Sequence, residues 1–305
     1  MDRLEPILQE AKKRAHPYAV FDMDFTLTVN DTEITTEYTQ VMHHLFWMDP
    51  VTFRKGMSSY YPQGFSSFAK EAVECYETLA SRKETDPTIR AAFQTAMFGV
   101  LHEVDNFPGL ENCTFPNFLK MGLKREELSV FTSLMLRHLL KEPLQSSYQG
   151  MTYPSGLRPN QVIIDILHRL HQEGIGIAVV SASYETDVKA MIKALSLEKE
   201  VDHVCAVKDA FDDCGYVLPI NGDSEGLLPW KEGKVAAIRR DLVPIFGEEP
   251  SFAFGDSNSD VPMLTSFPHL LLAGISPFAN GEEMLELAKK SQDVYQKGKT
   301  LVHRF

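Results

Sequence analysis

The sequence is poor in the features that mark several large classes of protein. Its four cysteines, Cys75, Cys113, Cys205 and Cys214, include no C-x-x-C pair, so a zinc ribbon, a redox motif or a disulfide framework lacks a supporting pattern. Its longest apolar run, residues 175–182, contains a glycine and falls far short of the roughly 18 residues of a membrane span. The N-terminal segment has mixed charge and no apolar stretch. We therefore expect a cytoplasmic protein with reduced thiols.

Positive charge is also in short supply. The chain has 30 Lys and Arg against 42 Asp and Glu, a net charge of -12. Nucleic acids and anionic membranes repel such a protein, so we expect neither as a partner. The sequence also lacks the G-x-x-x-x-G-K-[ST] motif of P-loop enzymes and the H-E-x-x-H motif of zinc proteases. An anionic substrate would require a bound cation in an enzyme of this charge.

What is present fits an ordinary folded enzyme of 305 residues, a length typical of about two domains. Several short apolar runs do not alternate with polar residues, which predicts strands covered on both faces. Segments with helical periodicity lie between them, and strand, helix, strand indicates a parallel α/β sheet. The predicted strands are residues 18–21, 175–180, 251–254 and 269–275, and the helical patterns are residues 162–170, 188–195 and 235–242.

The interval from residue 33 to residue 150 has a different character. It carries long helical patterns and no clear strand run. It returns to the α/β pattern through the segment YPSGLRPN, whose prolines and glycine are typical of a boundary. We therefore predict a discontinuous core of residues 1–32 and 151–305, interrupted by a mostly α-helical insert of residues 33–150.

Polar clusters follow three of the predicted strands. Because the carboxyl ends of parallel strands meet at one edge of a sheet, clusters far apart in the sequence can converge there on one site. Each cluster alone has an ordinary explanation as a turn or a helix cap, but together they favour a functional site. The clusters are residues 22–26 (DMDFT), 181–183 (SAS) and 255–260 (GDSNSD).

In this order the clusters resemble the haloacid dehalogenase superfamily, and within it the phosphatases of the phosphoserine phosphatase-like branch. The resemblance covers about residues 18–30 and 158–275 and implies a Rossmann-like core. The family motifs are D-x-D-x-T, here Asp22, Asp24 and Thr26; a serine after a strand, here Ser181; a lysine, here Lys234; and G-D-x-x-x-D, here Asp256 and Asp260.

The resemblance implies a role for each matched residue. Asp22 is the nucleophile, which takes up the phosphoryl group as an aspartyl-phosphate. Asp24, two residues along an extended chain, faces the same way and acts as general acid and base. Developing charge on the phosphoryl oxygens needs fixed donors. The expected phosphate-binding residues are Ser181, the backbone of Ala182, Lys234 and Thr26.

Carboxylates crowded against a phosphate require a hard cation, and the family cofactor is Mg²⁺. By the resemblance Asp22 and Asp256 are side-chain ligands, the backbone carbonyl of Asp24 is a further ligand, and Asp260 orients this shell from behind. Ligation by oxygen alone disfavours zinc. The lysine assignment has a competitor in Lys231; Lys234 is preferred because it begins a helical pattern after a glycine.

The sequence departs from phosphoserine phosphatases at two motifs. Ser257 and Ser259 replace the glycine and asparagine of G-D-G-x-N-D, and S-A-S replaces S-G-G at Ser181. These departures weaken the case for serine phosphate as the substrate. The helical insert occupies the position of a C1-type cap, which covers the site in this family, and it is larger than the cap of a phosphoserine phosphatase.

Candidate specificity residues lie at the start of the insert. Asp31 and Glu33 could meet a cationic part of the substrate, although helix capping or hinge solvation explains them equally simply. An aromatic wall could attract a choline-like head by cation–π interaction, although aromatics in a helical insert usually form its core. The aromatic candidates are Phe46, Trp47, Tyr60, Tyr61 and Phe65.

The sequence thus predicts Mg²⁺-dependent hydrolysis of a small phosphomonoester, with a phosphoserine- or phosphocholine-like metabolite as the substrate. Two alternatives stay open at this point: a phosphoprotein phosphatase, and an interaction module whose cap docks a protein partner. A phosphomutase shares the Asp-x-Asp chemistry but must retain its sugar between two transfers, and it is the weaker alternative.

Overall fold

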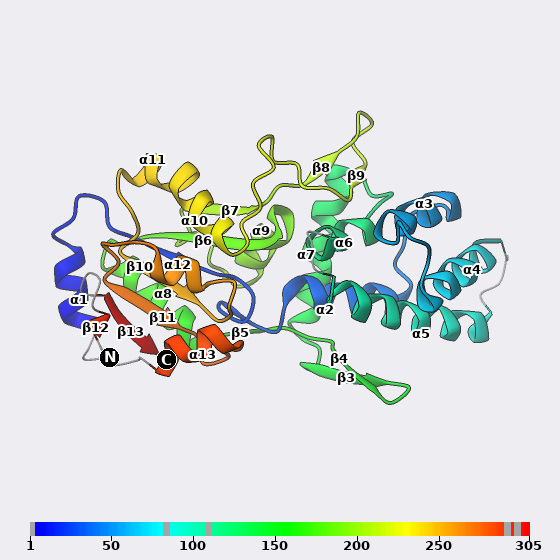
Figure 1. Ribbon diagram of the computed structural model, residues 1–305, viewed down its shortest axis with the longest axis horizontal. Coiled ribbons are helices and arrows are strands. Elements are labelled where there is room, and N and C mark those ends of the chain that lie inside the picture. Colours follow the sequence, from blue (N-terminus) through cyan, green and yellow to red (C-terminus); the bar gives the residue numbers. More distant parts are fainter. Residues whose placement is uncertain (1–3, 82–85, 108–110, 290–293, 296–299) are drawn as a thin grey trace.

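The computed structural model describes residues 4–81, 86–107, 111–289, 294–295 and 300–305 and has two lobes (Figure 1). The lobe on the left of Figure 1, the sheet lobe, contains a β-sheet between helices. The lobe on the right, the helical lobe, consists of helices and one hairpin. Within the described residues, no helix is both long enough and apolar enough to cross a membrane.

A seven-stranded sheet forms the centre of the sheet lobe, with strand order β12-β13-β11-β10-β1-β6-β7. All neighbouring strands are parallel except β12, which runs antiparallel to β13. The predicted parallel α/β core is therefore confirmed. The strands are β1 (Tyr18–Phe21), β6 (Gly176–Tyr184), β7 (His203–Val207), β10 (Phe252–Gly255), β11 (Leu272–Ile275), β12 (Val294–Tyr295) and β13 (Thr300–Arg304).

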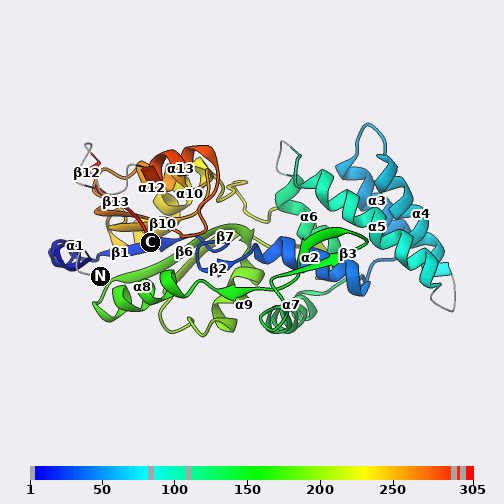
Figure 2. The same ribbon diagram turned by 90° about the horizontal axis from the view of Figure 1, so that it is seen from below.

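Helices cover both faces of the sheet, as Figure 2 shows. The side chains of Ala19 and Phe21 in β1 pack with α1, α8 and α9, whereas those of Tyr18 and Val20 pack with α10, α12 and α13. This two-sided burial explains why the strand sequences do not alternate. The helices are α1 (Leu4–Ala11), α8 (Gln161–Gln172), α9 (Glu185–Ala194), α10 (Glu232–Ala237), the π-helix η1 (Ile238–Leu242), α11 (Val243–Phe246), α12 (Val261–Thr265) and α13 (Glu282–Lys289).

The helical lobe has a separate core rich in aromatic side chains, including Phe53, Phe93 and Phe118. A hairpin of β3 (Gln145–Tyr148) and β4 (Met151–Pro154) packs against it through Tyr148 and Tyr153. The helices are α2 (Thr32–His43), α3 (Pro50–Tyr60), α4 (Ser67–Ser81), α5 (Pro87–Val104), α6 (Glu111–Leu119) and α7 (Arg125–Leu139).

The chain crosses between the lobes on a short two-stranded ribbon. Strand β2 (Thr28–Val29) leads out and pairs antiparallel with β5 (Arg158–Pro159), which leads back. A second ribbon, β8 (Ala210–Phe211) with β9 (Val217–Leu218), reaches from the sheet lobe to the helical lobe, where Val217 packs on Leu123 and Leu128. The division into a core of residues 1–32 and 151–305 and a cap of residues 33–150 is a proposal with which these crossings agree.

Helix α7 ties the lobes together although it belongs to the proposed cap. Its residues Met135, Leu136 and Leu139 share a hydrophobic cluster with Phe21 of β1. Just beyond α6, the buried Lys120 ammonium binds the carboxylate of Asp187 in α9. The hydroxyl of Thr132 in α7 donates a 3.2 Å hydrogen bond to the same carboxylate. A buried ion pair therefore joins the two lobes.

Replacing Lys120 with methionine should destabilise the protein, because it leaves the Asp187 carboxylate buried without its partner. We expect a loss of about 3–5 kcal/mol in the free energy of unfolding, measured by urea denaturation. The double variant Lys120→Met/Asp187→Leu should recover part of that loss. The control is Lys13→Met at an exposed ion pair with Glu10, where we expect a change below about 1 kcal/mol. Equal effects of Lys120→Met and Lys13→Met would contradict a buried link between the lobes.

Candidate active site

The three polar clusters predicted from the sequence lie together at the carboxyl edge of the sheet. Asp22 directly follows β1 and Asp256 directly follows β10, the neighbouring strand. Ser181 lies in β6, on the other side of β1. The structure differs from the sequence reading at this strand: β6 does not end at Ser181 but continues to Tyr184, with an irregular register beyond Val180.

A buried lysine joins two of the predicted aspartates. The Lys234 ammonium donates hydrogen bonds of 2.5 Å to Oδ1 of Asp22 and 2.5 Å to Oδ1 of Asp260. The residue Lys234 is only 2% exposed. The competing Lys231 does not share this position, since its ammonium lies 4.2 Å from the centre of the Trp230 ring. Of the two lysines, Lys234 is therefore the one that contacts the carboxylates.

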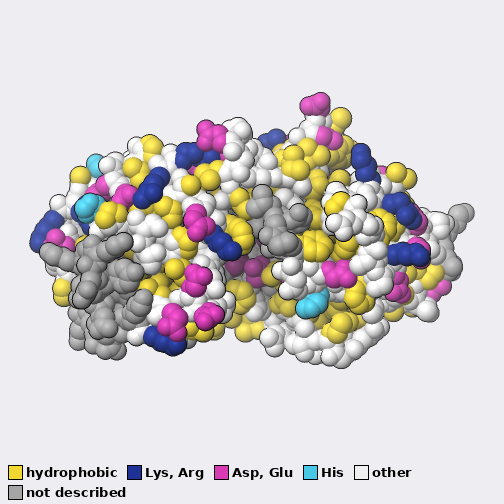
Figure 3. Space-filling model, in the orientation of Figure 1, with side chains coloured by type: hydrophobic (Ala, Val, Ile, Leu, Met, Phe, Trp, Pro, Cys, Tyr) yellow, Lys and Arg dark blue, Asp and Glu magenta, His cyan; other side chains and the backbone are white. Residues whose placement is uncertain are grey.

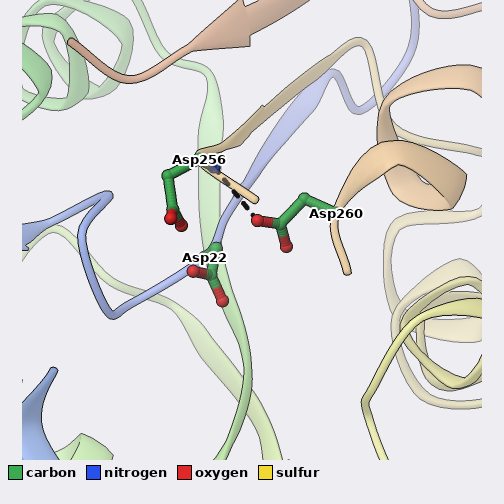
Figure 4. A group of neighbouring side chains, drawn as sticks. All are labelled: Asp22, Asp256 and Asp260. Carbon is green, nitrogen blue, oxygen red and sulfur yellow. Dashed lines mark hydrogen bonds between the residues drawn. The ribbon is translucent and has the colours of Figure 1, made fainter. Parts of the chain in front are cut away.

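Asp260 organises the loop that carries Asp256. Its Oδ2 accepts hydrogen bonds from the backbone N–H groups of Asp256 (3.0 Å) and Ser257 (3.1 Å). Figure 4 shows the three aspartates with their carboxylates converging and the bond from Asp256 to Asp260. Gly255 permits this turn, because a Cβ there would lie 2.4 Å from Cβ of Asp260. The glycine of the G-D-x-x-x-D motif is thus required by close packing against Asp260.

Asp256 is in turn oriented from two sides. The Thr26 hydroxyl donates to its Oδ1 at 3.2 Å, and the Asn280 amide donates to its Oδ2 at 3.3 Å. Thr26, predicted to bind phosphate, thus contacts a carboxylate through its hydroxyl. Its position favours a supporting role for that hydroxyl.

Asp24 is held by hydrogen bonds to both of its carboxylate oxygens. The backbone N–H of Thr32 donates to Oδ1 at 2.7 Å, and the Ser183 hydroxyl donates to Oδ2 at 2.8 Å. The Ser183 N–H donates to the hydroxyl oxygen of Ser181 at 3.0 Å, which turns the S-A-S segment around Ala182. Asp24 therefore faces Ser183 at the end of β6 as well as the first residue of α2.

A cavity of about 300 Å³ lies between the sheet lobe and the helical lobe. Its described lining includes Asp22, Asp24, Ser181, Lys234 and Asp256. Asp31 and Glu33 line it as well, but each also has a local structural partner. Asp31 caps α2 by accepting a 2.9 Å hydrogen bond from the N–H of Ile34, and Glu33 accepts one of 2.7 Å from the N–H of Tyr184. Helix capping therefore accounts for Asp31, and Glu33 braces the backbone of Tyr184; contact of either residue with a cationic part of the substrate stays a prediction.

Among the cavity-lining residues that were not predicted from the sequence, five have a polar side-chain group that bears on the site. Ser183 belongs to the predicted polar cluster of residues 181–183, whereas Asn280 and Trp230 lie in loops that carry no recognisable sequence motif. Glu37 follows Glu33 by four residues on one helical face, a spacing that could have identified it. None of the five aromatic candidates is among the described residues that line the cavity, so the predicted aromatic wall is wrong. The missed residues are Glu37, Asp105, Ser183, Trp230 and Asn280.

Burial raises the pKa values of the three carboxyl groups of Asp22, Asp24 and Asp256, and neighbouring carboxylates add to the shift of Asp22 and Asp256. Burial, with the nearby Asp260 and against the opposing effect of Lys234, raises the pKa of Asp22 to about 7. Burial and the Asp22 carboxylate raise the pKa of Asp256 to about 10. Burial also raises the pKa of Asp24, although its hydrogen bonds from Thr32 and Ser183 oppose the shift. The pocket therefore holds more carboxyl groups than one lysine can keep ionised near neutral pH.

The donor set fits a hard divalent cation. Carboxylate oxygens of Asp22, Asp256 and Asp260 lie within 4.8 Å of one another. Because Asp260 already binds Lys234 and two backbone N–H groups, Asp22 and Asp256 have the remaining capacity for a metal ion. Oxygen ligands of this kind suit Mg²⁺ and are a poor match for zinc.

Comparison with known proteins identifies the family. Residues 102–265, more than half of the chain, match the model of the haloacid dehalogenase-like hydrolases. The protein belongs to this hydrolase family. The matched segment runs from α5 to α12 and contains Ser181, Lys234, Asp256 and Asp260 of the predicted motifs, while Asp22 and Asp24 lie upstream of it. The hydrolase matches none of the curated proteins.

Solved structures share the fold of this hydrolase at low sequence identity. A functionally unknown protein from Anaerococcus prevotii has 20% identity and a TM-score of 0.74, covering 98% of this chain and 94% of that chain. A protein of unknown function from Bordetella pertussis has 16% identity and a TM-score of 0.55, covering 94% of this chain and 99% of that chain. A phosphoserine phosphatase matches at 15% identity with a TM-score of 0.45, covering 95% and 94%. The likeness to the Anaerococcus and Bordetella proteins concerns the fold alone, and no conclusion is drawn from the third match.

Divalent cation binding at Asp22 and Asp256 should strengthen with rising pH. Below the Asp22 pKa of about 7 the ion must displace a proton from the buried carboxylate, whereas above it this carboxylate is already ionised. Calorimetric titration with Mg²⁺ at about pH 6, 7 and 8, in buffers that differ in ionisation enthalpy, measures both the affinity and the protons released.

Asp256→Asn should weaken Mg²⁺ binding, and the exposed Asp213→Asn should leave it unchanged. An affinity that stays constant over this pH range without proton release would contradict a buried carboxylate site for the ion.

Proposed function

We propose that this hydrolase cleaves small phosphomonoesters through a covalent aspartyl-phosphate on Asp22. The observation that carries the proposal is the arrangement around Asp22: a buried carboxylate at the end of β1, bound by Lys234 and flanked in one cavity by Asp24, Ser181 and Asp256. Nucleophile, proton carrier and phosphate-binding groups are thus present together, which is the set that phosphoryl transfer through a carboxylate requires.

In the first half-reaction, a carboxylate oxygen of Asp22 attacks phosphorus while the bond from phosphorus to the leaving oxygen breaks. Asp24 gives its proton to that oxygen, which leaves as an alcohol. The raised pKa of Asp24, caused by burial, favours the protonated form that this step needs. The hydrogen bonds from Thr32 and Ser183 hold the side chain in one orientation.

In the second half-reaction, water attacks the phosphorus of the aspartyl-phosphate. Asp24, now a carboxylate, takes a proton from that water, and the bond from phosphorus to the Asp22 oxygen breaks. The products are inorganic phosphate and the restored Asp22 carboxylate. Asp24 therefore ends the cycle protonated, as it began, and no further reactant is needed.

Hydrogen-bond donors and one ammonium group in the cavity can stabilise the negative charge that develops on the phosphoryl oxygens. The Lys234 ammonium is buried beside Asp22, and the Ser181 hydroxyl and the backbone around Ala182 line the same cavity. We propose Mg²⁺ as the cofactor, held by Asp22, Asp256 and the backbone carbonyl of Asp24, with Asp260 supporting the site. The ion supplies positive charge that offsets the repulsion between the carboxylates and the phosphate.

The dimensions of the cavity favour a metabolite over a macromolecule. A volume of about 300 Å³ lies at the lower end of small-ligand pockets. The helical lobe covers the site and, as a proposed cap, leaves little access for a folded phosphoprotein. A phosphoprotein substrate, a docking role and a phosphomutase reaction have no comparable support, so a small phosphomonoester is the substrate class that we propose.

Replacing Asp22 with asparagine should abolish turnover, because an amide cannot form the acyl phosphate. We expect Mg²⁺-dependent phosphate release to fall by at least about 10³-fold, in a screen of phosphorylated metabolites and phosphopeptides. Mass spectrometry of acid-quenched wild-type enzyme should detect one added phosphoryl group on the peptide containing Asp22.

Circular dichroism should show that the fold of Asp22→Asn is intact, and Asp213→Asn serves as the active control. Wild-type rates in the Asp22 variant, or a phosphoryl group on another residue, would remove Asp22 from this role.

A further inference from the structure

The cavity wall opposite the nucleophile is acidic. On the side of the helical lobe, the carboxylates of Asp31, Glu33, Glu37 and Asp105 line the same cavity as Asp22. Among the described residues of the lining, Lys234 is the only basic one, and it is engaged by Asp22 and Asp260. Figure 3 shows acidic side chains in the hollow between the lobes. The nearby Lys120 ammonium partly offsets the charge of Glu33 and Glu37, but it is not among the described lining residues. A ligand that reaches this wall therefore meets several carboxyl groups and no basic side chain that is free to pair with them.

Glu37 differs from Asp31 and Glu33, its neighbours in and beside α2, in having no local partner. Asp31 accepts from the N–H of Ile34, and Glu33 accepts from the N–H of Tyr184. Glu37 is only 5% exposed, yet within the described chain no hydrogen bond or ion pair reaches its carboxylate. Burial, followed by the nearby Asp105 and Asp31, raises the pKa of Glu37 well above its usual range.

Such a group is costly to bury, since a desolvated carboxylate needs a hydrogen-bond donor or a positive charge. Packing does not explain it, because glutamate on the buried face of a helix is uncommon unless it is paired. Its four-residue spacing from Glu33 puts two like charges on one face of α2, which also disfavours the helix. The residue is better explained by a ligand that brings the missing donor.

We infer that Glu37, assisted by Asp105, binds the protonated primary ammonium of the substrate, which is then a phosphomonoester of an amino alcohol. The inference rests on the proposed phosphatase function and names its substrate class. The phosphate lies at Asp22 and Lys234, and the ammonium lies at the opposite wall. A primary ammonium offers three N–H donors, enough for Glu37 and for Asp105 at the end of α5.

Two related ligand types fit this wall less well. A quaternary ammonium has no N–H to donate and is best held against aromatic faces. The aromatic residues in the described lining are Phe25 and Trp230, and the Lys231 ammonium already lies 4.2 Å from the centre of the Trp230 ring. An amino acid ester such as serine phosphate carries a carboxylate, for which the described lining offers no second cation.

The test compares four substrates in the presence of Mg²⁺ by steady-state phosphate release: 2-aminoethyl phosphate, its neutral analogue 2-hydroxyethyl phosphate, phosphocholine and phosphoserine. For the wild-type enzyme we expect kcat/KM for the aminoethyl ester to exceed that for each of the others by at least about ten-fold, because charge-assisted hydrogen bonds are involved. In Glu37→Gln the preference over the neutral ester should fall toward one, through a loss on the aminoethyl ester alone.

Matched variants separate this role from a structural one. Asp105→Asn, at an exposed position, should lower the same ratio without affecting the fold. Glu126→Gln, an exposed position outside the cavity lining, should leave the ratio unchanged. Thermal unfolding of each variant checks that the fold persists.

The outcomes distinguish the inference from the function on which it rests. If the wild type hydrolyses the neutral ester, phosphocholine or phosphoserine as well as the aminoethyl ester, the phosphatase function stands and the ammonium site is wrong. Equal losses on the charged and neutral esters in both Glu37→Gln and Asp105→Asn would also overturn the ammonium site. If no phosphomonoester is hydrolysed, the phosphatase function fails and the inference fails with it.

Discussion

One buried ammonium among several buried carboxylates is the interaction on which the active site depends. Lys234 binds both Asp22 and Asp260, so it links the end of β1 to the loop after β10. A lysine enclosed in this way remains charged, because the attraction of Asp22 and Asp260 outweighs the burial that would lower its pKa. One ammonium cannot stabilise all of these carboxylates, so the pKa values of Asp22 and Asp256 are raised. The fold thereby produces an environment suited to a divalent cation and a phosphate.

The order of strands in the parallel sheet brings these carboxyl groups and the lysine to one place. Strands β10, β1 and β6 are neighbours, so the residues that follow or end them lie side by side although they are far apart in the sequence. Two-sided helical cover keeps the strands buried and rigid. The helical lobe then closes the open edge, with α7 and the Lys120–Asp187 pair holding it to the sheet lobe. The cavity between the lobes is therefore built by both.

Much of the sheet lobe could be predicted because its signals are local. Non-alternating apolar runs predicted the strands β1, β6, β10 and β11. The motifs after three of them carried the family resemblance, and that resemblance implied phosphoryl chemistry. The position of Lys234 at the start of a helix separated it from Lys231. Edge strands as short as β12, with two residues, carry too little pattern to be recognised.

The remaining site residues depend on contacts between distant segments. The Asn280 amide, in the loop before α13, donates a hydrogen bond to Asp256. Helical or strand periodicity in the sequence cannot predict a contact of this kind. Ser183 became relevant only because β6 continues past Ser181 and brings its hydroxyl to Asp24. Of the five aromatic candidates for a substrate wall, all except Trp47 pack in the core of the helical lobe, the usual place for aromatics in a helical insert. Burial of their large apolar surface stabilises that lobe. The four-residue spacing of Glu37 from Glu33 indicates a shared helical face, but only the structure shows that this face of α2 borders the cavity.

The most direct test of the account is a crystal structure of the protein with Mg²⁺ and beryllium fluoride, a mimic of the acyl phosphate. The account predicts the fluoride group on the Asp22 carboxylate, in contact with Lys234 and Ser181, and Mg²⁺ between Asp22 and Asp256. Beryllium fluoride bound to another side chain, or Mg²⁺ away from both aspartates, would contradict it.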